Sequence, residues 1–266
     1  LNYNNLEPKI WFRVNTLKSS IEEVYSMLNQ KKMHFKISDV SETFFYSKSV
    51  QELLKSNIMR NGFISVQNPA NGLVVKLLNP QQNKIIFDGC AAPGGKTNHI
   101  NELTKGKNQI YSYDIDNKRI ALMLNNLSNN IRCYRADLSR DPIKNYDVGL
   151  IDVPCTGTGV LSKRVDIKWR RKIEDISEMN KIQLSIMKNV SKYLNNKGVL
   201  VYSTCSIEEE ENWGIVNNFL NFNDEFQLDR ADKFVPTEYV DENGCLSTFP
   251  SYKDLDGIFA ARLIKK

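Results

Sequence analysis

Residues 84–97, KIIFDGCAAPGGKT, decide the fold class of this chain. Residues 84–87 form a short apolar run, which predicts a buried strand, and a glycine-rich turn follows directly. The residues after this turn predict a helix over 95–103. A strand, a glycine-rich turn and a helix in this order are typical of the first unit of an α/β domain that binds its ligand at the strand ends.

The rest of the chain continues the alternation of strands and helices, which predicts a doubly wound α/β sheet. One helix is indicated by apolar residues spaced along a single face, from Ile176 to Tyr193. The predicted strands cover 109–113, 131–135, 148–153, 198–202 and 258–264, and the predicted helices cover 117–127, 176–193 and 208–222.

A smaller region of mixed pattern precedes residue 84 and predicts a small α+β domain of the ferredoxin- or RRM-like kind. Strands are expected over 10–14, 35–37, 43–46 and 63–66, and helices over 20–30, 49–56 and 70–78. We therefore predict two domains, a small one over residues 1–78 and a larger one over 79–266.

Composition limits the possible protein classes. The hydrophobic content of 41% and the charged content of 25% are typical of a soluble globular protein, and no apolar run is long enough to cross a bilayer. Five cysteines without a C-x-x-C pair argue against both a disulfide framework and a zinc site, so we expect no metal. The net charge of +5 permits an anionic partner. The chain begins at Leu1, which is compatible with an excised part of a longer protein.

Two cysteine motifs follow predicted buried strands: Asp152-Val-Pro-Cys155 and Ser203-Thr-Cys205-Ser206. The carboxyl ends of parallel strands meet at one edge of a sheet, where ligands bind. Two cysteines with an aspartate at that edge indicate a site for thiolate chemistry. The alternative is a pair of structural cysteines, because free cysteine is often buried.

The glycine-rich turn indicates a nucleoside cofactor without phosphates. Its register misses the phosphate-binding P-loop pattern by one residue, since Cys90 stands where that pattern needs glycine, and no G-x-G-x-x-G follows. Asp114 is placed to accept from ribose hydroxyls and Asp137 from an adenine amino group. We therefore predict S-adenosylmethionine as the cofactor. The predicted cofactor residues are Cys90, Ala91, Ala92, Pro93, Gly94, Gly95, Lys96, Asp114, Arg119, Asp137 and Asp152.

The motifs DGCAAPGGKT, YDID, ADL, DVPCTGTG, DIKW, YSTCS with EEEEN, and DGIFAARLIKK together resemble the RsmB/Sun group of ribosomal-RNA cytosine-C5 methyltransferases. The upstream WFRVNTLK and FISVQNPA are also similar to that group. The resemblance implies a Rossmann-like S-adenosylmethionine-dependent methyltransferase domain preceded by a small RNA-binding domain. Two departures are Thr156, where the group usually has serine, and Val165, where it usually has proline.

The resemblance also implies roles for three residues. Cys205 would be the nucleophile that adds to C6 of cytosine, and Cys155 would abstract a proton or release the adduct. Asp152 would act at N3 of the base and border the cofactor. A thiol near pKa 8.5 needs positive charge nearby to ionise at neutral pH, and Lys96 or a basic side chain of residues 163–172 is expected to supply it.

Residues 162–172 are the most basic stretch and directly follow the Pro-Cys loop. Basic side chains there would neutralise phosphates and a tryptophan would stack on a base, although a solvated face is the alternative. The expected RNA-binding residues are Lys163, Arg164, Lys168, Trp169 and Arg170, with Arg13 and Asn15 added by family analogy.

Three other functions remain open. A DNA cytosine-C5 methyltransferase would use the Pro-Cys residue as nucleophile, but its Glu-Asn-Val signature is missing after that motif. A ribosome-assembly scaffold would bind RNA without catalysis, and a transfer RNA could replace ribosomal RNA as the substrate. We expect a monomer that does not associate with a membrane. The expected location is the cytoplasm, with the nucleolus or an organelle matrix as alternatives.

Overall fold

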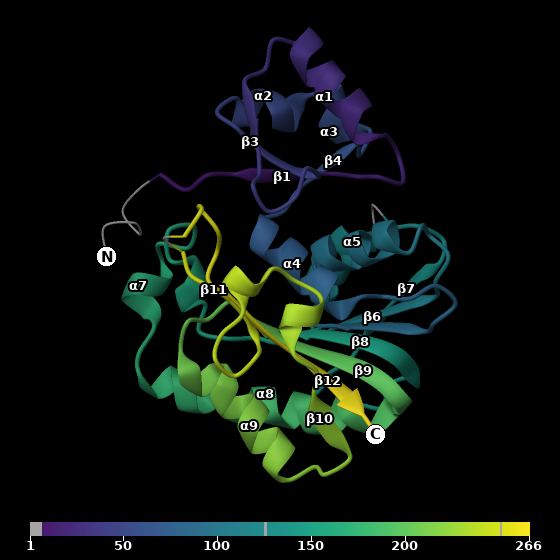
Figure 1. Cartoon of the computed structure of the whole chain (residues 1–266), viewed down its shortest axis with the longest axis vertical. Helices are drawn as coiled ribbons and strands as arrows, with labels where there is room; N and C mark the ends of the chain where they lie inside the picture. Colours follow the sequence, from purple (N-terminus) through teal and green to yellow (C-terminus); the bar gives the residue numbers. More distant parts are fainter. Residues whose placement is uncertain (1–6, 125–126, 251) are drawn as a thin grey trace.

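The computed structural model describes residues 7–124, 127–250 and 252–266. A small antiparallel sheet lies above a large, mostly parallel sheet, and helix α4 (Pro69–Leu78) lies between them (Figure 1). This helix starts at Asn68, whose side chain accepts a hydrogen bond from the Ala70 N–H. The arrangement confirms the predicted fold class.

The small sheet has the strand order β2-β3-β1-β4, and its strands alternate with helices in the pattern β-α-β-β-α-β of ferredoxin-like domains. The capping box predicted before the first helix is present, with Ser20 and Glu23 bonded to each other's backbone. The helices cover the face of the sheet that is turned away from α4 (Figure 1). The elements are β1 (Trp11–Val14), α1 (Ile21–Gln30), β2 (Phe35–Ile37), β3 (Phe44–Ser47), α2 (Val50–Lys55), α3 (Asn57–Arg60) and β4 (Ile64–Val66).

The large sheet has the order β10-β12-β9-β8-β5-β6-β7, with β11 paired to β12. Strands β5 to β9 are parallel, and the pairings of β10, β11 and β12 are antiparallel. The strands are β5 (Ile86–Gly89), β6 (Ile110–Asp114), β7 (Ile131–Arg135), β8 (Tyr146–Asp152), β9 (Leu194–Thr204), β10 (Phe226–Leu228), β11 (Leu246–Thr248) and β12 (Ile258–Lys265).

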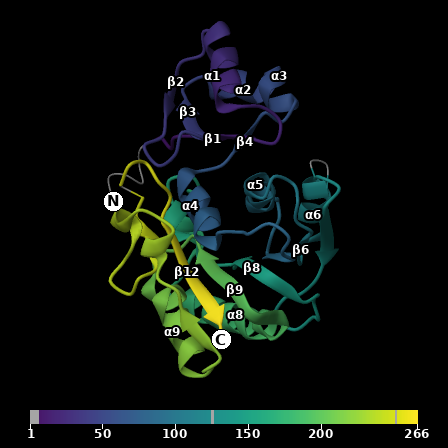
Figure 2. The ribbon, with the colours of Figure 1, turned by 45° about the vertical axis from the view of Figure 1, so that its right-hand side comes forward.

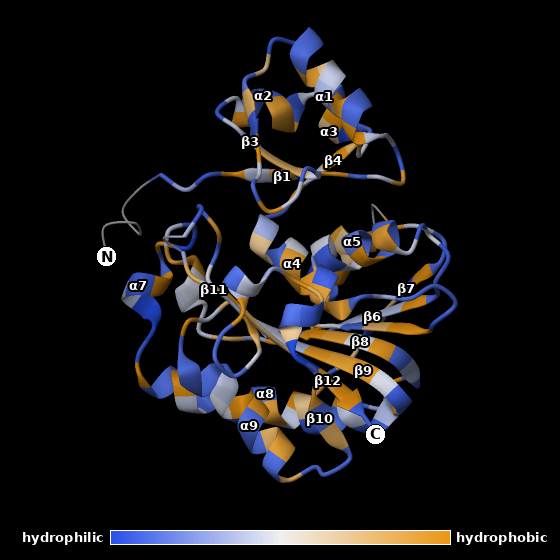
Figure 3. Ribbon diagram, in the orientation of Figure 1, coloured by the Kyte–Doolittle hydropathy of each residue, from blue (hydrophilic) through white to orange (hydrophobic). Residues whose placement is uncertain are grey.

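Helices cover both faces of this sheet, as Figure 2 shows, and the strands between them are apolar (Figure 3). Helices α4 and α5 pack on one face, and α8 and α9 pack on the other. The helices are α5 (Gly95–Leu103), α6 (Asn117–Leu124), α7 (Ile167–Arg170), α8 (Glu174–Val190) and α9 (Trp213–Asn221). The short 3-10 turns are η2 (Thr158–Val160), η3 (Ser191–Tyr193), η4 (Glu209–Glu211), η5 (Ala231–Lys233) and η6 (Thr237–Tyr239).

Several predicted boundaries were wrong. The helix expected over 208–222 is divided into η4 and α9, because the backbone of Asn212 (φ −105°, ψ −106°) leaves the helical region. Strand β9 begins at Leu194 rather than at 198, because Leu194 already pairs in parallel with Tyr146 of β8, before a register shift. The helix expected over 117–127 ends at Leu124; residues 125 and 126 lie outside the described residues, and Leu127 is not helical.

Helix α4 packs into the core of the large sheet although it precedes the expected domain boundary at 78/79. Leu73, Val74, Leu77 and Leu78 are buried in the same cluster as strand residues of that sheet. The boundary itself stays a prediction, and the packing of α4 provides a way to test it.

Candidate active site

The carboxyl ends of β5, β6, β8 and β9 meet at one edge of the large sheet and enclose a cavity of about 550 Å³. A neighbouring cavity of about 280 Å³ lies against the glycine-rich loop and the start of α5. All the predicted cofactor residues except Gly94 line one or both of these cavities. Gly94 begins α5 with a φ of 95°, a left-handed conformation that favours glycine.

Asp114 holds the glycine-rich loop in place from the end of β6. Its buried carboxylate accepts hydrogen bonds from the Ala92 N–H (3.0 Å) and the Asp116 N–H (3.0 Å). Arg119 lies 3.5 Å from the same carboxylate and also donates to the Ala92 carbonyl. This network connects the loop, the strand end and α6 in one rigid unit.

Asp88, at the end of β5, is a buried carboxylate with one unused oxygen. Thr97 donates to its Oδ2, whereas Oδ1 has no hydrogen-bond partner among the residues that the structure describes. Burial raises the pKa of Asp88 to about 7. The side chain lines the smaller cavity, where a cationic or hydrogen-bonding ligand group would satisfy it.

The two cysteine motifs meet at neighbouring strand ends, as the sequence predicted. Asp152 of β8 pairs with Ser203 of β9, and the sulfur atoms of Cys155 and Cys205 lie 3.2 Å apart. Either sulfur can be the donor in this contact, and the hydrogen bond lowers the pKa of Cys205 and raises the pKa of Cys155. These opposite pKa shifts favour a thiolate on Cys205 beside a protonated Cys155.

Lys96 brings a positive charge to the same place. Its Nζ lies 2.7 Å from Asp152, which also accepts a hydrogen bond of 2.9 Å from the Ser203 hydroxyl. Burial acts to lower the pKa of Lys96, but the charge and hydrogen bond of Asp152 raise it further, so the ammonium persists. The Lys96 charge also acts to lower the pKa of Cys205.

The Pro-Cys loop is held by residues that were not among the predicted site residues. Arg171 donates to the carbonyls of Thr156 (3.0 Å) and Cys155 (3.3 Å). Glu211 is fully buried and accepts from the Thr156 N–H at 2.9 Å. The acidic run at 208–211 is a visible signal in the sequence, but its pattern does not show which carboxylate turns inward.

Of the predicted RNA-binding residues of the basic segment, Lys163 and Arg164 line the cavities, and the other three do not. Trp169 is 86% exposed, and Lys168 and Arg170 are also exposed. Arg164 lines the larger cavity with an exposed side chain. Lys163 lines the smaller cavity, where it forms an ion pair of 2.6 Å with Asp256, the first residue of the DGIFAARLIKK motif, which was not among the predicted site residues.

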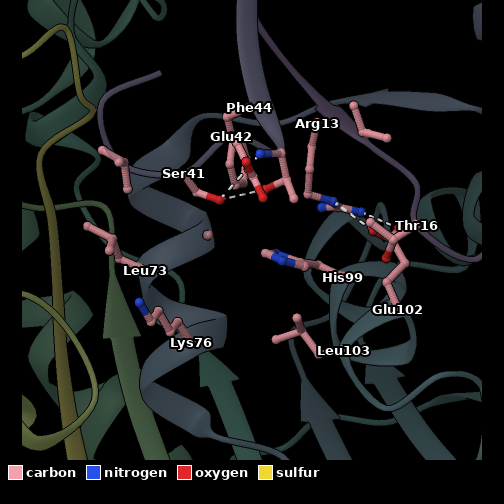
Figure 4. Close-up of a pocket in the computed structure, with 14 residues that line it drawn as sticks. Arg13, Thr16, Ser41, Glu42, Phe44, Leu73, Lys76, His99, Glu102 and Leu103 are labelled. Atoms are coloured by element: carbon pink, nitrogen blue, oxygen red, sulfur yellow. Dashed lines mark hydrogen bonds and ion pairs between the residues drawn. The ribbon is translucent and has the colours of Figure 1, made fainter. Parts of the chain in front are cut away.

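The small domain corrects one expectation. Arg13 is 1% exposed and forms an ion pair of 2.6 Å with Glu102 of α5, as Figure 4 shows, so its guanidinium does not present a phosphate-binding surface. It also donates to Gln67 and to the Gly95 carbonyl. The Asn15 side chain accepts from the Leu17 N–H and stabilises the turn after β1.

Arg13 and Glu102 border a separate cavity of about 440 Å³ between the small sheet, α4 and α5 (Figure 4). His99 projects into this cavity, and burial lowers its pKa well below the usual value. It lies outside both cavities at the strand ends. Among the described residues, no cluster of three or more His, Cys, Asp or Glu could hold a metal ion, and no helix could span a membrane.

The parallel sheet, the glycine-rich loop and the acidic strand ends define a Rossmann-like S-adenosylmethionine-dependent methyltransferase fold. Two solved structures have this fold. PH0851 superposes with a TM-score of 0.92 at 29% identity, covering 99% of this chain and 61% of that one. NSun6 from Pyrococcus horikoshii, solved with SFG, gives a TM-score of 0.87 at 21% identity, covering 99% of this chain and 92% of that one.

The sequence identifies the family. Residues 75–264 match the family model of the 16S rRNA methyltransferases RsmB/F, and the chain belongs to this family. The ribosomal RNA small subunit methyltransferase B of Proteus mirabilis is 34% identical over 249 residues. That alignment covers 89% of this chain and 57% of the relative, so the chain spans little more than half of that protein's length.

Proposed function

We propose that this protein transfers a methyl group from S-adenosylmethionine to C5 of a cytosine in RNA, with small-subunit ribosomal RNA as the substrate. The observation that carries the proposal is the pair of thiols 3.2 Å apart beside the Lys96–Asp152 ion pair. Structural cysteines alone would not need a cavity of about 550 Å³ in front of them. The name of the Proteus mirabilis relative supports ribosomal RNA as the substrate class.

The residues at the strand ends fit S-adenosylmethionine, the cofactor of this family. The unused Oδ1 of Asp88 suits the ammonium of the methionine part, and the Asp114–Arg119 unit suits the adenosine part, with Asp137 at the edge of the larger cavity. When bound, this cofactor supplies an electrophilic methyl group. The remaining chemistry belongs to the side chains of the protein.

Cytosine C5 is a weak nucleophile, so the thiolate of Cys205 first adds to C6 and makes an S–C6 bond. Hydrogen bonding at N3 by the Lys96–Asp152 pair stabilises the charge that develops on the ring. The electron pair at C5 then forms the new bond to the methyl carbon, and the electron pair of the broken sulfur–methyl bond stays on the departing thioether sulfur. We assign the release step to Cys155: once Cys205 is a neutral thioether, Cys155 gives its thiol proton to solvent and its thiolate takes the C5 proton. The electrons of the C5–H bond re-form the C5–C6 double bond, which expels the Cys205 thiolate and restores the aromatic ring.

RNA reaches the strand-end cavity only if the target base is unpaired or flipped out, because the thiols lie within the site rather than on the protein surface. The exposed cations of the basic segment would neutralise nearby phosphates, and Trp169 would stack on a base. Contacts of this kind suit both ribosomal and transfer RNA, and sequencing of the trapped RNA will show which of the two is the substrate.

The test uses purified protein, S-adenosylmethionine and total RNA, with adducts resolved on a denaturing gel for wild type, Cys155→Ala and Cys205→Ala. We expect a stable RNA adduct in Cys155→Ala alone, because the S–C6 bond forms but is not released. Sequencing of the trapped RNA then identifies the substrate.

Adduct in Cys205→Ala instead would reverse the two roles and favour the mechanism of the DNA enzymes. If no variant traps RNA and wild type forms no 5-methylcytosine, although S-adenosylmethionine binding is intact, a non-catalytic RNA-binding scaffold replaces the proposal.

A further inference from the structure

A buried carboxylate holds the loop that carries Cys155. Glu211 is 0% exposed, and its Oε1 accepts hydrogen bonds from the Thr156 N–H (2.9 Å) and from Gln183 Nε2 (2.9 Å). Its Oε2 accepts from the Thr156 hydroxyl. Gln183 Nε2 also donates to the Pro154 carbonyl at 2.9 Å. The loop is therefore held immediately before and immediately after Cys155.

Asn212, which follows Glu211 in the chain, holds the segment that contains Cys205. The Asn212 side chain accepts a hydrogen bond of 2.6 Å from the Thr204 hydroxyl and donates one of 3.0 Å to the Ser206 carbonyl. Thr204 and Ser206 are the two neighbours of Cys205. Two consecutive residues, Glu211 and Asn212, thus contact the two cysteine loops.

The negative charge at Glu211 is a costly feature of this connection. A buried carboxylate loses its hydration, and among the described residues it forms no ion pair that would replace it. Three hydrogen-bond donors offset that cost. The charge also acts on the thiols: the pKa of Cys155 is raised by its hydrogen bond to Cys205, by burial, by the charge of Cys205 and, least of these four, by the charge of Glu211.

We propose that Glu211 is a positioning residue that keeps Cys155 against Cys205, so that release of the RNA adduct depends on it more than formation of the adduct does. The inference rests on the proposed function. Its basis is that the Glu211 carboxylate contacts the Cys155 loop directly, whereas Cys205 is held mainly by its strand and by Asn212, with one longer contact of 3.3 Å between the Thr156 and Ser206 hydroxyls. Loss of the carboxylate would therefore displace Cys155 and leave the nucleophile in place.

The experiment compares Glu211→Gln with wild type and Cys155→Ala in the adduct gel and in steady-state methylation. Glu211→Gln has nearly the same shape but replaces one acceptor oxygen by a donor. We expect trapped RNA to rise towards the Cys155→Ala level and kcat to fall about tenfold, with KM for RNA and S-adenosylmethionine binding unchanged. Glu209→Gln, an exposed position in the same turn, is the matched control and should behave as wild type.

Thr156 provides a second route to the same contact if Glu211→Gln does not fold. Thr156→Val removes the hydroxyl that donates to Glu211 and keeps the side-chain shape, so trapped RNA should again rise. Thr156→Ser retains the hydroxyl and should restore wild-type release. If the contact between Thr156 and Glu211 only stabilised the fold, Thr156→Val and Thr156→Ser would change the stability of the protein but would not raise the level of trapped RNA.

Wild-type adduct levels and turnover in folded Glu211→Gln would overturn the inference. Loss of adduct and turnover together, with S-adenosylmethionine binding intact, would also overturn it, because Glu211 would then support the attack by Cys205. Trapping in Cys155→Ala but in neither the Glu211 nor the Thr156→Val variant rejects this inference alone. Failure of Cys155→Ala to trap RNA rejects the proposed function and this inference with it.

Discussion

At the scale of single residues, Cys155 and Cys205 share one hydrogen bond but have pKa values shifted in opposite directions. The thiol of Cys155 stabilises a thiolate on Cys205, and Lys96 adds a positive charge nearby. The hydrogen bond is the largest effect, and together with the Lys96 charge it outweighs burial and the charges of Asp152 and Asp256, so the pKa of Cys205 is lowered. Cys205 consequently retains its thiolate at a lower pH than an ordinary cysteine does.

This assignment predicts the pH dependence of alkylation. The rate of modification of Cys205 by iodoacetamide, followed by mass spectrometry, should rise with pH around a midpoint below the ordinary thiol value of about 8.5. In Cys155→Ala the midpoint should move to higher pH, because the stabilising S–H donor is lost. A midpoint that stays the same in Cys155→Ala would show that the hydrogen bond does not set the pKa of Cys205.

At the scale of elements, the basic segment that contains α7 is the surface best placed to hold RNA. Trp169 lies on this helix with 86% of its surface exposed, so its removal should leave the fold intact. We expect Trp169→Ala to weaken RNA binding by about 1–3 kcal/mol without changing the melting temperature.

Fluorescence anisotropy with the trapped RNA sequence would measure this change, and S-adenosylmethionine affinity should stay constant. Phe222→Ala is a matched control, since Phe222 is 76% exposed and lies at the end of α9. Equal losses in the two variants would mean that exposed aromatic residues in general, and not α7, contribute to RNA binding.

A second element-scale prediction concerns the attachment of β1 to α5. Arg13→Ala removes the partner of Glu102 and leaves a carboxylate 5% exposed without its counter-ion. Breaking a buried ion pair in this way should lower the free energy of unfolding by about 3–5 kcal/mol in urea denaturation. Arg60→Ala, at an exposed position of the same domain, should change it by less than about 0.5 kcal/mol.

If Arg13 instead contacted RNA, its loss would weaken RNA binding and leave stability unchanged. The double variant Arg13→Ala/Glu102→Ala is the further check, because removal of both charges should cost less than the sum of the two single changes.

At the scale of the whole molecule, α4 decides where the large domain begins. Its side chains fill the core of the large sheet, and Asn68 caps its first turn. A fragment of residues 68–266 carrying Glu102→Gln should therefore fold and bind S-adenosylmethionine, whereas a fragment of 79–266 should not. Each leucine removed from the core costs about 2 kcal/mol in lost burial.

Circular dichroism and thermal unfolding of the two fragments would test this prediction. Cooperative unfolding of the 79–266 fragment, together with cofactor binding, would place the boundary at 78/79 and show that α4 is dispensable for the large domain.

The sequence by itself determined the order of the elements, the sheet edge on which the site lies and the pairing of the two cysteine motifs. These features follow from local patterns: apolar runs define parallel strands, and the residues directly after such strands must share one edge. Cys155, Cys205, Asp152 and Lys96 could therefore be assigned to one site before any geometry was known.

Only the tertiary structure decided which polar side chains turn inward. Arginine and glutamate are usually surface residues, yet Arg13 and Glu211 are both buried. Distant partners make this possible: Glu102 pairs with Arg13, and Thr156 and Gln183 donate hydrogen bonds to Glu211. Contacts between residues 28 to 89 positions apart leave no local pattern in the sequence. The free energy of burying a charged side chain depends on such partners. Because folding brings these partners together, the role of a buried charged residue is defined only in the folded chain.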